Sequence, residues 1–353
     1  MNNTYFYHDK PLFGLDVGYS SAKAMQLDWS GKKRVVKGYG VTNFPSDYVS
    51  NGELKNPEGI ANVIYGLFEK QLIGEITTRR VAISVPATRT FNRPITLPKL
   101  ASKDIKEAVY LEAEQYIPIP LDELYIDYAV TGQTETELQL LAVAAPKKMI
   151  DSYVILARLL GLELVTLETS IAASSRLFEQ AEQSDSPTVL IDFGSIAADI
   201  TVYHHDLVVT GAVPCGGDIF TDILADKLGV TKQEAHIIKT KYGLGVSKKQ
   251  EQITAALNPT LTDLLKEIRR VIRYYEERAS GNTKIEQVVT MGGGANMPGL
   301  SEFMTSSLRL PVRMCNPWEN LAFGDLQPPN NTEKSMYVTV AGLSMINPTR
   351  IFV

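Results

Sequence analysis

The sequence predicts an α/β protein made of two similar lobes that face each other across a cleft. The prediction rests on one pattern that occurs twice: an apolar strand ends in an Asp-x-Gly turn, and two further strands follow. Internal repetition of such a unit indicates a duplicated architecture, which would bring both turns to the same cleft. The strands expected from the two copies are 12–17, 22–28 and 34–41, and 188–192, 199–203 and 207–214.

Further elements are expected within each half of the chain. Apolar residues recur at helical spacing in 57–71, and a strand is expected at 81–85. The pattern of expected elements changes over 86–161, where a strand, an acidic helix and a hairpin indicate an inserted subdomain. The second half is expected to contain helices at 220–227, 232–242 and 259–279, a strand at 287–291 and an Ala341-Gly342-Leu343 turn inside the apolar tail.

Composition argues against several functions. The formal net charge of −5 comes from interspersed acids and bases, so no broad basic field is available and nucleic-acid binding is not expected. No run of about 18 apolar residues could cross a bilayer, and residues 1–10 do not resemble a secretory signal. We therefore expect a cytoplasmic protein that does not insert directly into a membrane. The two cysteines match no disulfide framework or metal-ligand spacing.

The first Asp-x-Gly turn has the residue types of a phosphate-binding loop. Glycine lets the backbone turn tightly, so that amide and hydroxyl groups can point at phosphate oxygens. Asp16 could hold a hydrated Mg²⁺, and Lys23 could supply a positive charge to a phosphate. An Asp-x-Gly sequence is also a common turn. The candidate phosphate-binding residues here are Asp16, Gly18, Tyr19, Ser20, Ser21 and Lys23.

Two more glycine-marked loops strengthen the nucleotide hypothesis. The second follows the strand 188–192, and the third, at 292–294, follows a strand and precedes a helix near Ser301. Consecutive glycines allow flat backbone approach to a base or ribose, although a tight strand-to-helix turn would also use them. There is no P-loop or GxGxxG motif. The further candidates are Asp192, Gly194, Ser195, Gly216 and Gly217 for phosphate, and Gly292, Gly293, Gly294 and Asn296 for adenosine.

In this order, the three loops resemble the phosphate 1, phosphate 2 and adenosine motifs of the actin, Hsp70 and sugar-kinase superfamily. Within that superfamily, three stretches are similar to the inserted 1C subdomain of the type IV pilus assembly PilM family, which is related to the cell-division protein FtsA. These stretches are Ser84-Val85-Pro86, Ile95-Thr96-Leu97-Pro98 and the segment from Glu112 to Glu123.

The resemblance implies an actin-like ATPase fold, with two lobes built on a duplicated RNase H-like core. It also implies that Asp16 and Asp192 hold Mg²⁺ through water, and that His236 and Lys239 lie at the adenosine. The resemblance implies that lobe 1 covers 1–185 and carries a 1C-like insertion at about 86–161. It implies that lobe 2 covers 186–330 and contains subdomains 2A and 2B, with 2B at about 217–285. The remaining segment, 331–353, would return to lobe 1.

The resemblance further implies a role in pilus assembly. An ATP-binding protein of this family would dock the N-terminal cytoplasmic tail of a PilN-like inner-membrane protein, and would link that platform to the pilus motor ATPase. Its tail groove would involve subdomains 1A and 1C, where an extended peptide places apolar side chains in pockets. The protein would be peripheral to the inner membrane through this partner.

Two departures from the superfamily pattern bear on catalysis. Ala197 and Ala198 stand where phosphate-facing hydroxyls are common, and His236 replaces the usual glutamate while Lys239 is retained. Hydrolysis also needs a group that positions water, and no residue can be named for it. We therefore expect ATP binding with weak or no hydrolysis, and the catalytic residues stay unknown.

Three other functions remain open at this stage. An FtsA-like polymerising protein would be expected to carry a basic amphipathic helix in its tail, which 335–353 does not show. A small-molecule kinase would need a general base near the γ-phosphate. A scaffold of a related secretion system would share the features described above.

Overall fold

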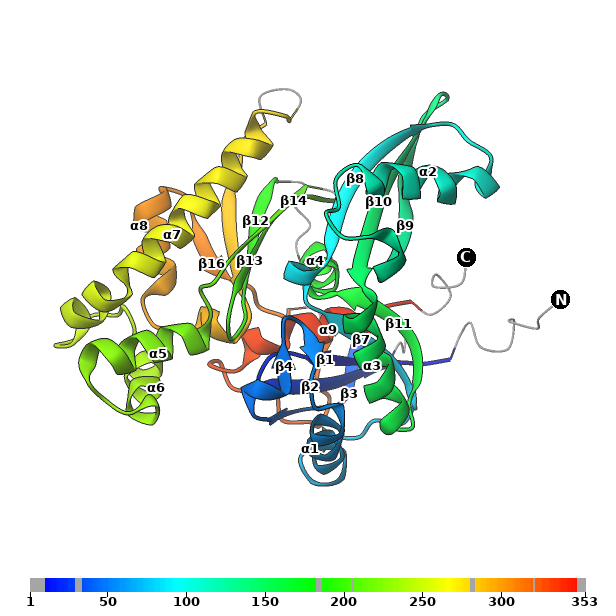
Figure 1. Cartoon of the computed structure of the whole chain (residues 1–353). Coiled ribbons are helices and arrows are strands. Elements are labelled where there is room, and N and C mark those ends of the chain that lie inside the picture. The colour runs from blue at the N-terminus through cyan, green and yellow to red at the C-terminus, as the bar shows by residue number, and fades with distance from the viewer. Residues whose placement is uncertain are drawn as a thin grey trace.

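The computed structural model describes residues 10–28, 34–181, 186–204, 206–279, 283–319 and 321–347. Within these residues, no helix combines the length and apolar character needed to span a bilayer. The chain forms two lobes side by side, and a smaller subdomain projects from the first (Figure 1).

The sheet of the first lobe has the order β11-β7-β1-β2-β3-β17, with β6 also pairing with β3. β1, β2 and β3 form an antiparallel meander, whereas β7 and β11 are parallel to β1. Joining of β17 to β3 means that the chain returns to this lobe before residue 331. The strands are β1 (Phe13–Val17), β2 (Ser21–Asp28), β3 (Arg34–Asn43), β6 (Ile73–Gly74), β7 (Arg80–Val85), β11 (Glu163–Thr169) and β17 (Leu321–Ala322), with a small pair β4 (Val49–Ser50) and β5 (Glu53–Leu54) beside them.

The sheet of the second lobe repeats this topology. Its order is β14-β13-β12-β15-β16, in which β12, β13 and β14 form the meander and β15 and β16 run parallel to β12. The duplication that the sequence predicts is therefore confirmed, with β12 in the place of β1. The strands are β12 (Thr188–Phe193), β13 (Ala198–His204), β14 (Asp206–Val213), β15 (Gln287–Met291) and β16 (Val312–Met314).

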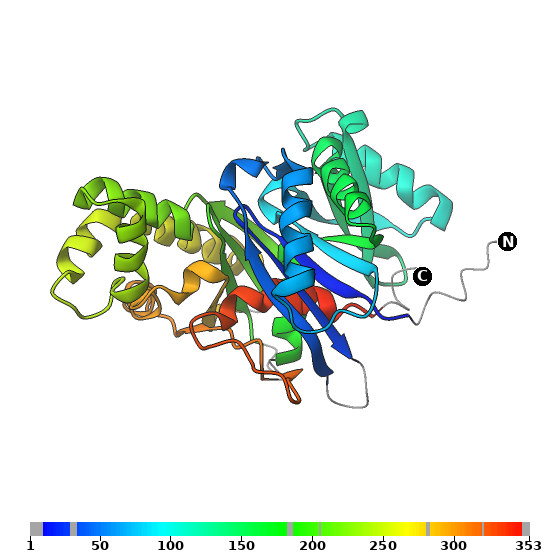
Figure 2. The same cartoon turned by 90° about the horizontal axis from the view of Figure 1, so that it is seen from below.

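Two helices join the lobes by crossing between them (Figures 1 and 2). α9 (Val338–Ser344) packs on the first sheet, where Gly14 lies so close to it that a Cβ would meet the Val340 carbonyl at 2.7 Å. α4 (Ser170–Ala181) follows the first sheet, yet its Leu177 and Phe178 share a core with Leu190 of the second. The helices cross in tight contact, because a Cβ on Gly342 would overlap the Ala173 backbone. The expected turn at 341–343 is thus wrong: the segment is a buried helix.

The inserted subdomain is a sheet of order β8-β10-β9 covered by α2. Its elements are β8 (Phe91–Pro98), α2 (Ser102–Glu114), β9 (Leu124–Gln133) and β10 (Glu137–Pro146). The next helix, α3 (Lys147–Leu159), packs instead in the core of the first lobe near α1 (Pro57–Lys70). The inserted sheet therefore ends at Pro146, although the expected insertion extended to residue 161.

Helices fill the outer part of the second lobe. They are α5 (Gly217–Leu228), α6 (Lys232–Lys241), α7 (Gln250–Glu276) and α8 (Leu300–Leu308). α7 begins before the predicted start at 259, with Pro259 inside it. Proline usually ends a helix because it lacks an N–H and clashes with the preceding turn. Here an apolar stripe that includes Ile253, Leu257 and Leu261 is buried on both sides of the proline, which stabilises the continuous helix.

Candidate nucleotide site between the lobes

Asp16 is fixed at the end of β1 by its two neighbouring strands. It lies opposite Lys23 on β2 and opposite Ser84 on β7. The Lys23 Nζ donates to Asp16 Oδ2 at 3.2 Å, and the Ser84 Oγ donates to Asp16 Oδ1 at 2.6 Å. Two donors therefore orient this carboxylate at the mouth of the first glycine loop.

The first loop makes a tight turn that reaches the other lobe. The Gly18 N–H donates to the Ser21 carbonyl at 2.9 Å, which closes the turn between β1 and β2. A Cβ on Gly18 would have no neighbour closer than 3.4 Å, so the loop backbone is open to an incoming group. The Ser20 Oγ donates to Asp218 Oδ2 at 3.3 Å across the lobes. The predicted loop thus faces the start of α5.

The second loop rests on the N-terminus of α5. The Gly217 N–H donates to the Gly194 carbonyl at 2.9 Å, and the Asp218 N–H donates to the Ser195 carbonyl at 2.7 Å. A Cβ on Gly216 would overlap the backbone of Ser195 and Ile196, so only glycine fits there. Because the N-terminus of a helix carries partial positive charge, this arrangement favours an anion.

The third loop closes against the second. Gly292 has a φ of +83°, and a Cβ there would overlap the Asp192 carboxylate. Ser335 holds Gly292 from both sides, since its carbonyl accepts from the Gly292 N–H at 3.1 Å and its Oγ donates to the Gly292 carbonyl at 2.9 Å. A Cβ on Gly217 would lie 3.8 Å from the Gly294 Cα. The glycine loops predicted from the sequence therefore meet.

The adenosine candidates lie beside this meeting point to different degrees. Lys239 is buried on α6, and its Nζ donates to the Gly217 carbonyl at 2.6 Å and to the Thr221 Oγ1 at 2.9 Å. Burial lowers the pKa of Lys239, and Asp218 partly opposes this. His236 is exposed one turn earlier, and partial burial and Lys239 lower its pKa. Asn296 donates at 3.4 Å to Gly293 within its own turn.

A pair of carboxylates lies on the second sheet. Asp192 and Asp199 face each other across β12 and β13. Burial and the charge of Asp16 raise the pKa of Asp192 to about 6. Lys23 and the Thr339 Oγ1, which donates to Asp192 Oδ2 at 3.4 Å, act in the opposite direction. Burial and Asp192 raise the pKa of Asp199 to about 8. The Oδ1 of Asp199 is buried and has no hydrogen-bond partner among the described residues.

Sequence reasoning missed five residues that border the site. Asp199 had a detectable signal, because it follows Asp192 at the spacing at which Lys23 follows Asp16. Asp218 follows the Gly216-Gly217 pair directly, and an acid in the first turn of a helix is common. The others reach the site only through tertiary structure; they are Ser84, Tyr153 and Thr339.

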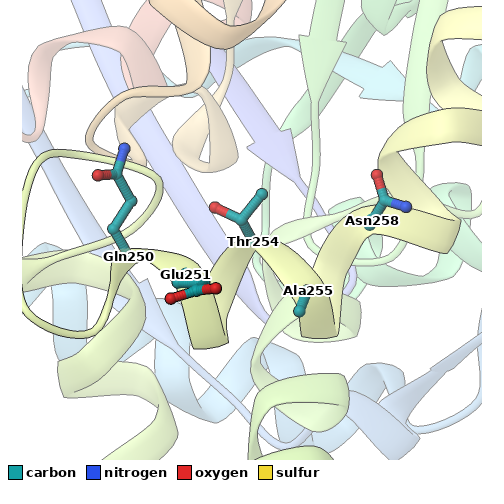
Figure 3. Close-up of a pocket in the computed structure, with 5 residues that line it drawn as sticks. All are labelled: Gln250, Glu251, Thr254, Ala255 and Asn258. Atoms are coloured by element: carbon teal, nitrogen blue, oxygen red, sulfur yellow. The ribbon is translucent and has the colours of Figure 1, made fainter.

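No metal cage is present in the described part of the chain: no group of three or more His, Cys, Asp or Glu side chains could enclose an ion. A hollow of about 570 Å³ lies along the first turns of α7 (Figure 3). It includes none of the glycine-loop residues, so it is not the candidate nucleotide site. Its lining residues are Gln250, Glu251, Thr254, Ala255 and Asn258.

Two lobes of one topology, joined by crossing helices and meeting at three glycine loops, define an actin-like ATPase fold. A solved structure of MreB5 of Spiroplasma citri bound to AMPPNP has this fold, with a TM-score of 0.57 at 12% identity over 94% of each chain. The family model described as "Type IV pilus assembly protein PilM" matches residues 14–347. The chain belongs to that family, which confirms the resemblance seen in the sequence.

Two further relatives agree with this assignment. The solved "PilM-PilN type IV pilus biogenesis complex" contains a chain that superposes with a TM-score of 0.83 at 24% identity, covering 97% of this chain and 99% of that one. The cell division protein FtsA of Pseudomonas aeruginosa is 22% identical, over 95% of this chain and 89% of FtsA. The predicted fold and the predicted distant relation to FtsA are both confirmed.

Proposed function

We propose that this chain binds Mg²⁺-ATP between its lobes and docks the N-terminal cytoplasmic tail of a PilN-like membrane protein in type IV pilus assembly. The meeting of three glycine loops beside Asp16 and Asp192 carries the nucleotide half of the proposal. MreB5 structures bound to AMPPNP and to ADP, which share the fold, support it. Membership of the PilM family and the solved PilM–PilN complex support the partner.

The residues fit a hydrated cation and a polyphosphate. Asp16 raises the pKa of Asp192, so the two carboxylates are near enough to repel each other, and a divalent cation between them would relieve that repulsion. When bound, Mg²⁺ would neutralise phosphate charge while keeping much of its water shell. Asp16 and Asp192 would hold those waters, Lys23 would turn toward a phosphate, and the α5 N-terminus would contribute its partial positive charge.

We further propose that nucleotide acts mainly as a conformational ligand, with weak or no hydrolysis. Ala197 offers a methyl group at the second loop, where a hydroxyl donor would add a contact to phosphate, whereas Ala198 is buried in the core and faces away from the loop surface. A ligand held by residues of both lobes favours the state in which the lobes are close, and it can shift the equilibrium only by that difference in affinity. ATP would in this way set the shape of the partner site.

The junction between the first lobe and the inserted subdomain is the proposed docking site. Tyr125 of β9 donates its hydroxyl to Asp151 of α3 at 3.0 Å, and its ring stays 47% exposed. Ile155 and Leu159 follow Asp151 at helical spacing and are 43% and 39% exposed. This stripe offers apolar contacts to an extended tail. Such docking would hold the protein on the cytoplasmic side of the inner membrane, next to the motor ATPase.

Calorimetry tests both halves of the proposal. Mg²⁺-ATP, and separately a peptide copying the partner's tail, are titrated into the wild type, Asp16→Ala and the exposed control Asp226→Ala. We expect Asp16→Ala to weaken ATP binding by about tenfold or more, since charge-assisted contacts are lost, and Asp226→Ala to leave it unchanged. Peptide binding that is absent with and without nucleotide, or equal for a scrambled peptide, would overturn the docking proposal.

The alternatives are less favoured. A polymerising division protein or a small-molecule kinase would share the fold, but the family model that matches residues 14–347 is that of a pilus assembly protein. Sedimentation with ATP would reveal polymers, and ADP release that depends on an added sugar would reveal a kinase.

A further inference from the structure

Helix α3 borders two regions that the proposed function treats separately. Its buried face, which includes Tyr153, packs in the core of the first lobe together with Val17 and Ala22, the residues flanking the first glycine loop. Its exposed stripe contains Ile155 and Leu159, the residues proposed to contact the partner's tail. One rigid helix therefore lies between the phosphate loop and the docking surface.

The hydroxyl of Tyr153 is the unusual group on the buried face. The side chain is fully buried, and its Oη has no hydrogen-bond partner among the described residues. Burial raises the pKa of Tyr153, and the nearby Tyr19 and Asp16 raise it further. Phenylalanine would fill the same space without a buried polar atom, so the hydroxyl points to a hydrogen bond made in another state of the loop.

Asp16 provides an acceptor for that hydrogen bond. Its Oδ1 accepts from Ser84, and its Oδ2 accepts from the Lys23 Nζ. If Lys23 turns to a phosphate, as proposed above, Oδ2 loses the Lys23 donor and can accept another hydrogen bond beside a metal-bound water. A phenolic O–H is the right kind of group to replace Lys23, because carboxylate oxygens form strong hydrogen bonds with such donors.

The N-terminal end of α3 is tied to the inserted subdomain. The Lys147 Nζ donates to the Asp122 carbonyl at 2.7 Å and lies 5.6 Å from the centre of the Tyr125 ring. Tyr125 in turn donates to Asp151. A shift of α3 would therefore be transmitted to the junction where the tail is proposed to dock.

We propose that Tyr153 senses nucleotide: when Lys23 turns to a phosphate, the Tyr153 hydroxyl donates to Asp16 and repositions α3, which changes the docking surface. This inference rests on the proposed function and adds to it the route by which ATP acts on the partner site. Tyr153 is a positioning residue, because it acts through Asp16 and α3 and not on the nucleotide itself.

Hydrogen exchange of α3 with and without saturating Mg²⁺-ATP tests the inference without the partner. The wild type, Tyr153→Phe and Tyr275→Phe are compared; Tyr275 is a buried tyrosine of the second lobe whose hydroxyl contacts the His204 ring at 2.7 Å. We expect ATP to slow exchange in α3 by about fivefold or more in the wild type and in Tyr275→Phe. In Tyr153→Phe most of this slowing should disappear, although ATP still binds.

The outcomes separate the two proposals. If calorimetry shows no ATP binding by the wild type, the proposed function fails and the inference falls with it. If ATP binds but α3 exchange is unchanged, or Tyr153→Phe retains the full effect, only the inference is overturned.

The tail peptide gives a second readout of the same coupling. We expect its Kd to change by about fivefold between the nucleotide-free and ATP-bound wild type, and by less than about twofold in Tyr153→Phe. Without nucleotide, the peptide should bind both proteins equally. A variant that binds the peptide weakly in both states would mean that Tyr153 merely supports the fold of the junction, which contradicts the inference.

Discussion

The two lobes share a topology but place a basic residue in one and an acidic residue in the other at the same position. In the first lobe, the aspartate that ends β1 faces Lys23 across the strand pair. In the second, the aspartate that ends β12 faces Asp199. The first carboxylate is therefore neutralised within its own lobe, whereas burial and neighbouring charge raise the pKa of both carboxylates in the second. Duplication has kept the backbone and changed the electrostatics.

This difference between Lys23 and Asp199 indicates which groups each lobe would offer to a bound nucleotide. The first loop offers a cation and two hydroxyl groups, from Lys23, Ser20 and Ser21. The second offers the partial positive charge at the start of α5 and the Asp192 carboxylate, but a methyl group at Ala197. Phosphate charge would thus be met mainly by the first lobe, and each lobe would supply one aspartate to the metal, Asp16 and Asp192.

The comparison holds only if the two lobes stay joined, and the largest effect is expected where their helices cross. Gly342→Ala should reduce the free energy of unfolding by about 3 kcal/mol or more, because its Cβ would overlap the Ala173 backbone. Urea unfolding measures the loss. Gly66→Ala is the control: a Cβ there meets nothing within 4 Å, so the α1 substitution should stabilise by about 0.5–1 kcal/mol. Equal effects would contradict the described crossing.

The next effect removes the charge that distinguishes the first lobe. Lys23→Gln should weaken Mg²⁺-ATP binding by about 10- to 100-fold, since hydrogen bonds to charged groups contribute about 1.5–3 kcal/mol. Lys37→Gln, at an exposed position of β3, should leave affinity unchanged. Calorimetry at fixed ionic strength measures both. A loss of less than about threefold for Lys23→Gln would mean that the first lobe does not meet the phosphate charge.

A smaller effect is expected from the carboxylate that distinguishes the second lobe. The pKa of Asp199, about 8 in the folded protein, lies above the ordinary value of about 3.9 for an unfolded aspartate. The folded state therefore binds the proton more tightly than the unfolded state. The stability that this proton contributes is lost progressively as pH rises from about 4 to about 8. Asp199→Asn removes this loss, and its amide can donate to Asp192.

Urea unfolding between pH 5 and pH 8 tests this sign. Relative to the wild type, Asp199→Asn should gain stability with rising pH, by on the order of 1 kcal/mol or more. Glu163→Gln, an exposed acid on β11, should show no such trend. A constant difference across this pH range would contradict the raised pKa.

The smallest effect makes the second loop more like the first. Ala197→Thr adds a hydroxyl at a half-buried position of the loop and should tighten ATP binding by about two- to fivefold, the value of one neutral hydrogen bond. Ala197→Val has the same shape without the hydroxyl and serves as the control. Equal affinities of the two variants would show that this position does not face phosphate.

Much of the framework could be predicted because its signals are local. The strands that end in Asp-x-Gly were found in both copies, since apolar runs bounded by glycine turns need no tertiary information. The duplication predicted that the two Asp-x-Gly turns face one cleft, whereas the contact of Gly294 with Gly217 depends on tertiary packing. The predicted roles of these residues toward ATP and Mg²⁺ stay predictions.

The rest could not be predicted because tertiary packing decides it. In α4 and α9, small residues such as Ala173 and Gly342 allow the two helices to pack closely. In the sequence alone, segments with such small residues resemble a turn or a weak helix. Tyr153 gives no signal in the sequence, because only the fold places α3 beside the first loop. Thr339 reaches Asp192 from the far end of the chain for the same reason.

The crossing of α9 onto the first sheet also affects how the protein is made. The ribosome synthesises β1 and β2 long before the helix that covers them, Val338–Ser344. At about 5–20 residues per second, the strands β1, β2, β3, β7 and β11 wait many seconds for this cover after β11 is complete. During that time the face around Gly14 is exposed, which makes the nascent chain a natural client for chaperones that bind apolar strands.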